Sequence, residues 1–189
     1  MDLSLDTRPG LPEALRVLLR DHPREAWEAD PNFNGLIAFW LDRHMMFRQL
    51  SEALTSEAQS LLDAQTDPRR FAGAVGRHGS MLVQQLRGHH QIEDHHYFPV
   101  LATRDTRLEK GFALLDADHH ALDAHLERFV QAANGALQLA TGDSPDPRRA
   151  AGDFLAANDV LARVLTRHLD DEEDLIVPVI LRYGTEGLG

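Results

Sequence analysis

The chain has 189 residues, 43% of them hydrophobic and 26% charged, which is the composition of one compact globular domain rather than of a disordered segment. Its formal net charge of -11 argues against binding to nucleic acid or to an anionic membrane surface, because both need a clustered positive surface. The absence of cysteine excludes disulfides, thiolate metal sites and thiol catalysis, so histidine and carboxylates remain as the metal-binding side chains.

Residues 1–32 form a leader ahead of the main helices. Within it, Pro12 to about Arg20 is predicted as one short amphipathic helix, followed by two X-Pro pairs that act as helix breakers. Met1–Gly10 has neither a basic start nor an apolar run, and no stretch of the chain approaches ~18 consecutive apolar residues. We therefore expect a cytoplasmic protein with no membrane anchor. The leader itself is expected either to cap the domain or to form a contact in a homodimer.

Four long helices are predicted after the leader, because apolar residues recur at helical spacing and no segment alternates as a strand does. Their expected bounds are Phe33 to about Ala64, Pro68 to about Ala102, Thr106 to about Leu139, and Pro147 to Pro178, where the proline is expected to break or kink the helix. Thr106 and Glu109 have the spacing of a capping box at the start of the third helix. Short links between neighbours predict an all-α, up-down-up-down four-helix bundle over residues 33–183, with residues 1–32 as an N-terminal extension and 184–189 as a C-terminal tail.

One motif occurs twice in the chain with the same internal spacing, which indicates an internal duplication. Each copy has an Asp-Pro pair, then a His, a Glu four residues later, and a Pro: Asp67, His89, Glu93 and Pro99 in the first copy, and Asp146, His168, Glu172 and Pro178 in the second. The Asp caps the free N–H groups of a helix, and Pro at the first helical position loses no hydrogen bond. The His and Glu project from one helical face, where they can bind one ion together.

Counting along the helices brings four histidines to one level. At a rise of ~1.5 Å per residue, His44 in the first helix lies level with His89, and His119 in the third helix lies level with His168. Glu93 and Glu172 follow about one turn later. Any one of these histidines alone is more often a hydrogen-bonded core residue than a ligand. Four imidazoles and two carboxylates buried together would cost several kcal/mol without compensation, so we expect a metal centre.

The ligand types predict which metal binds. Imidazole and carboxylate without sulfur suit iron, manganese or zinc, and two bridging carboxylates with two imidazoles per ion suit a dinuclear site, with iron as the leading candidate. No H-E-x-x-H motif occurs, so a zinc protease has no support.

The third helix offers two registers. A strict repeat nominates Asp123, whereas the level count nominates His119, and the conflict is one helical turn. Loop insertions are cheap, but moving a ligand by a turn displaces it by ~6 Å. We therefore expect His119 to be the ligand, with Asp123 adjacent as a weak extra ligand or hydrogen-bond acceptor. His90 lies three residues before Glu93, and a helix interface is favoured for it over a ligand role.

The residues now carry a resemblance to a known family. His44 within Arg-His-Met-Met-Phe-Arg, His89-x-x-x-Glu93 followed by Phe98-Pro99, Asp118-His119, and His168-x-x-x-Glu172 resemble the hemerythrin-like HHE cation-binding domain over roughly residues 33–183. The resemblance implies a non-haem di-iron centre, bridged by Glu93 and Glu172, that binds or reacts with dioxygen or related small molecules. Oxygen-carrying hemerythrins have a second His where this chain has Asp123, which argues against reversible transport.

Two classes of function remain. The first is a di-iron protein that binds or turns over dioxygen, nitric oxide or peroxide at a carboxylate-bridged centre in the bundle core. The second is a metal-binding bundle that senses or handles iron without turnover. Whether the protein is an enzyme stays open between them.

Overall fold

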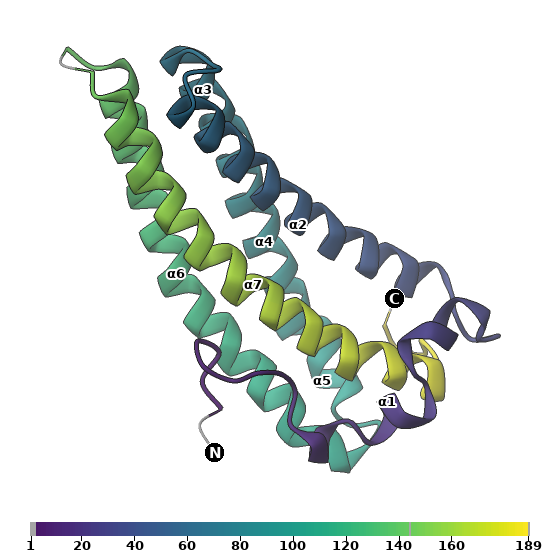
Figure 1. Ribbon diagram of the computed structural model, residues 1–189. Coiled ribbons are helices and arrows are strands. Elements are labelled where there is room, and N and C mark those ends of the chain that lie inside the picture. The colour runs from purple at the N-terminus through teal and green to yellow at the C-terminus, as the bar shows by residue number, and fades with distance from the viewer. Residues whose placement is uncertain (1–2, 144, 189) are drawn as a thin grey trace. The chain divides into compact units, whose positions relative to one another are not determined.

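The computed structural model describes residues 3–143 and 145–188, and these form helices and connecting segments without a strand (Figure 1). The predicted all-α class is confirmed for this part of the chain, and the arrangement is consistent with a helical bundle. The up-down-up-down order stays a prediction. The chain divides into two compact units. Unit 1 comprises Met1–Met45, His89–Ala121 and Leu165–Gly189, and unit 2 comprises Met46–Gly88 and Leu122–Val164.

The four predicted helices occur at nearly the expected bounds. The first is α2 (Gly35–Leu62). The second is divided into α3 (Pro68–Ala74), α4 (Ser80–Ile92) and α5 (Phe98–Leu101) by two π-helical segments, Val75–Gly79 and Glu93–Tyr97. The third is α6 (Glu109–Thr141), preceded by a 3-10 turn (Thr106–Leu108), and the fourth is α7 (Pro147–Tyr183). Every helix in the described residues is too short or too polar to span a lipid bilayer.

Both Asp-Pro pairs start helices as predicted. Oδ1 of Asp67 accepts hydrogen bonds from the backbone N–H groups of Arg69 and Arg70, at 3.0 Å each. Oδ1 of Asp146 accepts one from the backbone N–H of Arg149 at 3.2 Å. Each aspartate thereby satisfies N–H groups that the first turn of a helix leaves without a partner.

Two predicted helix boundaries are wrong. The third helix is capped by Asp105 rather than by Thr106: Oδ1 of Asp105 accepts the backbone N–H of Arg107 at 3.1 Å, and its Oδ2 accepts the Tyr183 hydroxyl at 3.0 Å. The fourth helix continues through Pro178 to Tyr183. An interior proline costs ~3 kcal/mol, and burial of the flanking residues 175–177 and 179–181 offsets this cost.

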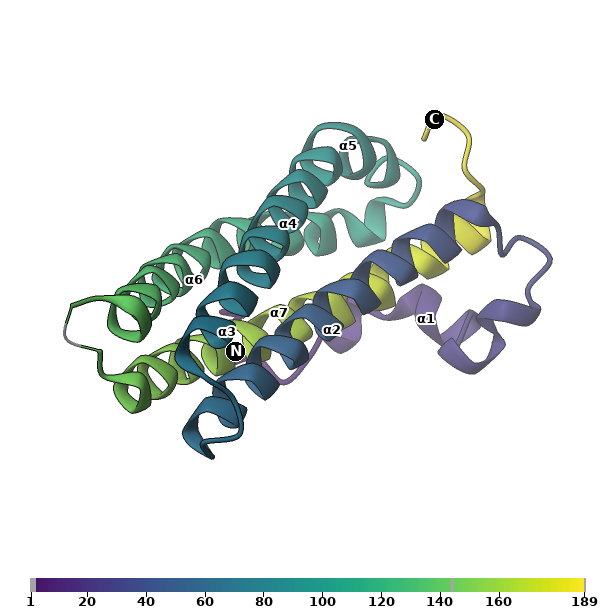
Figure 2. The ribbon, with the colours of Figure 1, turned by 90° about the horizontal axis from the view of Figure 1, so that it is seen from above.

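The leader forms part of the core of unit 1. Instead of the single predicted helix, it contains a 3-10 turn (Glu13–Leu15), α1 (Val17–Asp21) and a 3-10 segment (Arg24–Ala29). Four of its buried side chains belong to the same core cluster as residues of α2 and α7, and they are Leu11, Leu15, Leu18 and Trp27. Figures 1 and 2 both show α1 beside the C-terminal part of α7. At about 1.5–3 kcal/mol per large buried side chain, the leader contributes to the stability of this unit.

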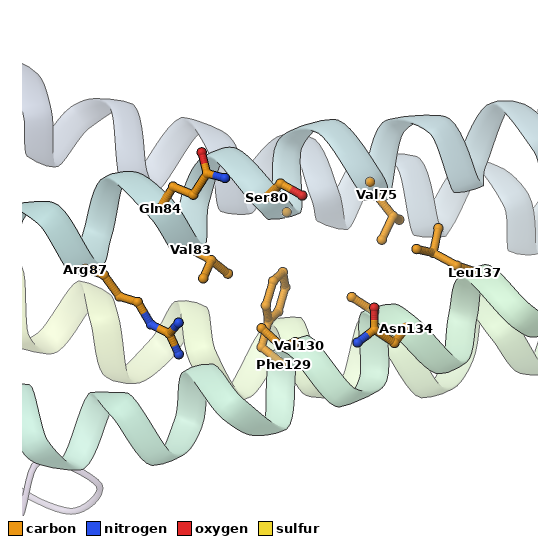
Figure 3. A pocket seen from close by; sticks show the side chains of 12 residues that line it. Val75, Ser80, Val83, Gln84, Arg87, Phe129, Val130, Asn134 and Leu137 are labelled. Atoms are coloured by element: carbon orange, nitrogen blue, oxygen red, sulfur yellow. The ribbon is translucent and has the colours of Figure 1, made fainter.

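Unit 2 has its own core and a surface pocket. The rings of Phe71 and Phe129 both pack against Phe154, with centroids 6.1 and 5.5 Å away. A pocket of about 330 Å³ lies between the π-helical segment Val75–Gly79, α4 and α6, with the Phe129 ring in its wall (Figure 3). None of the predicted metal ligands lines this pocket. Six of the seven belong to unit 1, and Asp123 belongs to unit 2.

Candidate metal centre

Two groups of His and Glu side chains come together in unit 1. Within each group the possible ligand atoms all lie within 4.8 Å of one another. The first ligand group is His90, His119 and His168, and the second ligand group is His44, His89, Glu93 and Glu172. Six of these seven residues are the His and Glu ligands predicted from the sequence. They come from α2, α4, the π-helical segment after it, α6 and α7.

Glu172 lies between the two ligand groups. Its Oε2 is 3.4 Å from Nε2 of His168 in the first group and 3.6 Å from Nε2 of His44 in the second. Its Oε1 accepts a hydrogen bond from the indole N–H of Trp40 at 2.9 Å, which fixes the orientation of the carboxylate. The side chain is fully buried. One oxygen therefore faces histidines of both groups, which is the arrangement that a bridging carboxylate needs.

Glu93 makes the corresponding contacts from the other copy of the motif. Its Oε1 lies 2.9 Å from Nε2 of His89, and its Oε2 lies 3.6 Å from Nε2 of His119. Glu93 is the first residue of the π-helical segment Glu93–Tyr97. Such wide turns are frequent at functional sites, and α7 has none after Glu172. The two copies of the motif therefore differ in backbone although their spacing is the same.

Three histidines each have a carboxylate next to their Nδ1 atom. We call these three side chains the outer carboxylates. The pairs are Nδ1 of His44 with Glu173 at 3.0 Å, Nδ1 of His119 with Asp94 at 2.7 Å, and Nδ1 of His168 with Asp118 at 3.4 Å. A carboxylate at Nδ1 favours the tautomer that carries its proton there. This leaves the Nε2 lone pair for a metal ion and fixes the ring plane.

Several buried atoms that face the centre lack hydrogen-bond partners. Among the residues that the structure describes, these atoms are Nε2 of His90, His119 and His168, both carboxylate oxygens of Glu93, and Oε2 of Glu172. An unsatisfied buried polar atom costs about 1–3 kcal/mol. All six atoms are of types that coordinate iron, manganese or zinc, so the donor set fits metal ions bound between the two groups.

Burial also determines which ligands carry protons. It raises the pKa of Glu93 to about 8, and burial together with the Glu93 charge raises the pKa of Glu172 to about 8. Burial lowers the pKa of His89 to about 4 and the pKa of His90 and His168 well below the ordinary 6.5. Near neutral pH these three imidazoles are thus neutral and ready to coordinate. The two glutamates hold protons that a cation would displace.

Two further candidates were considered in the sequence analysis. Asp123 is exposed and belongs to neither ligand group, so its expected position next to the ligands has no support. His90, favoured for a helix interface, packs between helices, because its ring stacks on that of His119 from α6 with centroids 4.0 Å apart. It also belongs to the first ligand group, so a ligand role for it is a proposal.

Sequence reasoning missed the outer carboxylates. Asp94 directly follows Glu93, and Glu173 directly follows Glu172. In both copies of the motif, the candidate bridging glutamate is therefore followed by a second acidic residue. That repeat was the signal that could have identified them. Asp118 was noted only as the neighbour of the His119 ligand. Sequence reasoning also missed the hydrogen bond from Trp40 to Glu172, because nothing in the spacing of Trp40 indicates it.

Comparison with known proteins agrees with this geometry. A family model described as the hemerythrin HHE cation binding domain matches residues 35–180, a span that includes every member of both ligand groups. No curated protein and no solved structure matches the chain significantly.

Proposed function

The chain belongs to the hemerythrin HHE cation-binding domain family, and on this premise we propose that it is a non-haem di-iron protein whose centre binds or reacts with dioxygen, nitric oxide or peroxide. The position of Glu172 carries the proposal, because its Oε2 lies within 3.6 Å of a histidine from each ligand group. A carboxylate shared between two ions accounts for this arrangement, because it contacts ligands of both.

The proposed ligand set divides between two ions. His44 and His89 bind one ion, His119 and His168 bind the other with His90 as a further imidazole, and Glu93 and Glu172 bridge them. Asp123 receives no role because its side chain is exposed. The family's name specifies only a cation. Iron is our leading candidate because reaction with dioxygen, nitric oxide or peroxide needs a metal with accessible redox states.

The residues of the chain would prepare and protect the centre. Bound iron would supply one-electron exchange with the small molecule. Burial keeps the imidazoles of His89, His90 and His168 neutral. The outer carboxylates fix the rings of three histidines, and the Trp40 indole N–H holds one oxygen of Glu172. His44, Glu93, His168 and Glu172 are all 0% exposed, so bulk water is excluded from the ligand atoms.

A second candidate function is iron sensing or iron handling without turnover. The observation that favours it is the third imidazole in the first ligand group: with His90, His119 and His168 together, one ion is offered three nitrogens besides the glutamates. A more completely ligated ion has fewer positions for a small molecule.

Metal analysis and anaerobic spectroscopy test the proposal. Protein purified from iron-replete cells should contain two iron ions per chain. Fe(II)-loaded protein should develop charge-transfer absorption on exposure to air, nitric oxide or peroxide. Two irons that stay silent towards all three molecules would favour the sensing or handling function. Protein that purifies with one metal ion or none, and cannot be loaded with two, would contradict both the di-iron centre and its bridging.

A further inference from the structure

Arg8 of the leader is buried against the first ligand group. Its Nη1 donates to Oδ1 of Asp118 at 2.7 Å, its Nη2 donates to Oδ2 of the same carboxylate, and its Nε donates to Oδ2 of Asp171 at 2.8 Å. Asp118 is the outer carboxylate of His168. The Arg8 side chain is 1% exposed. Arg8 is far from the ligands in the sequence, yet it makes a bidentate contact with Asp118, the carboxylate that orients His168.

Arg24 of the leader does the same for the second ligand group. Its Nη1 donates to Oε2 of Glu173 at 2.7 Å, its Nε donates to Oδ1 of Asp174 at 2.6 Å, and its Nη2 donates to the backbone oxygen of Asp170 at 2.9 Å. Glu173 is the outer carboxylate of His44. One oxygen of Glu173 therefore faces the arginine while the other faces the imidazole.

The two contacts form a pattern. Each ligand group contains one histidine whose outer carboxylate is held by a leader arginine. Both arginines precede residue 35, where the match to the family model begins. They therefore lie outside the matched span and contact residues within it.

We propose that the leader is a working part of the metal centre: Arg8 and Arg24 are positioning residues that fix the carboxylates of Asp118 and Glu173, and through them the ligand histidines His168 and His44. The inference rests on the proposed function, because it assumes that the two ligand groups hold metal ions. An outer carboxylate without its arginine can rotate away from Nδ1. The imidazole then loses both its fixed plane and its fixed tautomer.

The two chains of contact lead to different ions, so their removal should have different effects. Arg24→Gln should weaken the ion bound by His44, and Arg8→Gln should weaken the ion bound by His168. Loss of such supporting contacts typically costs 10–100-fold in metal affinity, and we expect about that range for one ion in each variant. Arg20→Gln is the matched control, because Arg20 is a leader arginine that is 63% exposed and paired only with the exposed Glu13 at 3.7 Å.

The experiment uses the full chain and Co(II) as the probe, because its absorption reports coordination geometry. Each variant is titrated anaerobically, and the affinity and spectrum of both ions are recorded. His44→Ala and His168→Ala provide the reference spectra that assign each ion. The Co(II) that binds weakly in Arg24→Gln should be the one that His44→Ala loses. Arg24→Lys, which restores the charge but not the fork, should recover part of the affinity.

The outcomes separate this inference from the proposed function. Wild-type protein that binds no metal would refute the proposed function itself. Wild-type protein with two ions, alongside Arg8→Gln and Arg24→Gln that bind both as tightly, would overturn the leader's role alone. If Arg8→Gln does not fold because Asp118 is left buried, Arg24→Gln carries the test, since the Arg24 side chain is 42% exposed. A lower melting temperature of the metal-free protein with unchanged metal affinity would assign the arginines a structural role only and would also overturn the inference.

Discussion

The Nε2 atoms of His44 and His89 lie 3.1 Å apart, and the two ring planes stand at 89° to one another. Two nitrogens bound to one ion at about 2.1 Å and at a right angle to each other are separated by roughly 3.0 Å. The pair therefore has the separation that two ligands of a single ion need before any ion binds. Such preorganisation lowers the free-energy cost of assembling the centre.

The first prediction follows from this pair. His44→Ala should reduce the content from two ions to one per chain, because the second ligand group loses a nitrogen that no other residue replaces. His22→Ala is the matched control, since His22 is a partly exposed leader histidine paired with Asp30. Metal analysis after equilibrium dialysis provides the measurement. Two ions retained in His44→Ala would contradict the assignment of this histidine.

The second prediction concerns the bridging residues. Glu93→Gln and Glu172→Gln should each lose metal affinity by more than about 100-fold, because a neutral amide bridges two cations poorly. The metal-free variants should melt no lower than the metal-free parent, since the side chain keeps its volume while a buried ionisable group disappears. Thermal unfolding with and without metal measures both effects. Wild-type affinity in either variant would rule out that glutamate as a bridge.

The third prediction distinguishes the two registers of the third helix. His119→Ala should weaken the ion of the first ligand group, because it removes the Nε2 atom that faces Glu93 at 3.6 Å. Asp123→Ala should leave the affinity and the spectrum of both ions unchanged, because the side chain is exposed. His120→Ala, next to the ligand and exposed, is the control for helix damage. If Asp123→Ala empties a site while His119→Ala is silent, the register is wrong.

The fourth prediction is that metal binding displaces protons from the glutamates. In the folded protein the pKa of Glu93 and of Glu172 is raised to about 8 from the ordinary 4.5, mainly by burial. Each contributes stability to the metal-free fold that is present below pH 4.5 and is lost as the pH rises through 8. Metal needs the ionised form, so its affinity should increase from pH 6 to 8 and then level off.

Proton release should follow the same pH range. Loading at pH 7 in a weak buffer with an indicator dye should release protons, and loading at pH 9 should release almost none from these groups. His89 should add nothing at pH 7, because burial lowers its pKa to about 4. Equal proton release at both pH values, or a flat affinity between pH 6 and 9, would contradict the assignment.

The fifth prediction concerns the cap of the 3-10 turn Thr106–Leu108 that leads into α6, and not the metal. Asp105→Ala should lower the free energy of unfolding by about 1–2 kcal/mol, because it removes a helix cap and an acceptor for the Tyr183 hydroxyl. Hydrogen bonds from Arg107 lower the pKa of Asp105 to about 2, so its contribution is present above pH 3.8 and is lost as the pH falls through 2. Denaturant unfolding at pH 7 measures the loss, and Tyr183→Phe should reproduce only part of it. An unchanged midpoint would refute the capping role, while the metal content of both variants should be unaffected.

The sequence predicted the features that depend on local chemistry. Asp67 and Asp146 cap helices because their carboxylates reach N–H groups two or three residues away. Such contacts can be predicted from residues that are close together in the sequence. The ligand histidines could be placed by counting, because the rise of a helix is constant. The end of the fourth helix could not be predicted in this way. Whether Pro178 breaks the helix depends on the burial of the residues that flank the proline.

Contacts between distant residues were beyond the same reasoning. Arg8 lies 110 residues from Asp118 and 163 from Asp171, and no periodicity connects them. The leader's contacts with Asp118 and Glu173 were not predicted, because such contacts depend on how the folded chain brings distant residues together. The two π-helical segments were not predicted either.

The π-helical segment Glu93–Tyr97 has a consequence for the internal duplication. Pro99 and Pro178 occupy the same place in the two copies, yet Pro99 is exposed and Pro178 is buried. A wide turn changes the helical phase of everything after it, so equal spacing no longer means an equal face. The two copies therefore keep the same spacing along the chain but differ in their surroundings just beyond the candidate bridging glutamates. After Glu172 the helix stays buried through residues 175–181, whereas after Glu93 the side chains of His95 and His96 are exposed to solvent.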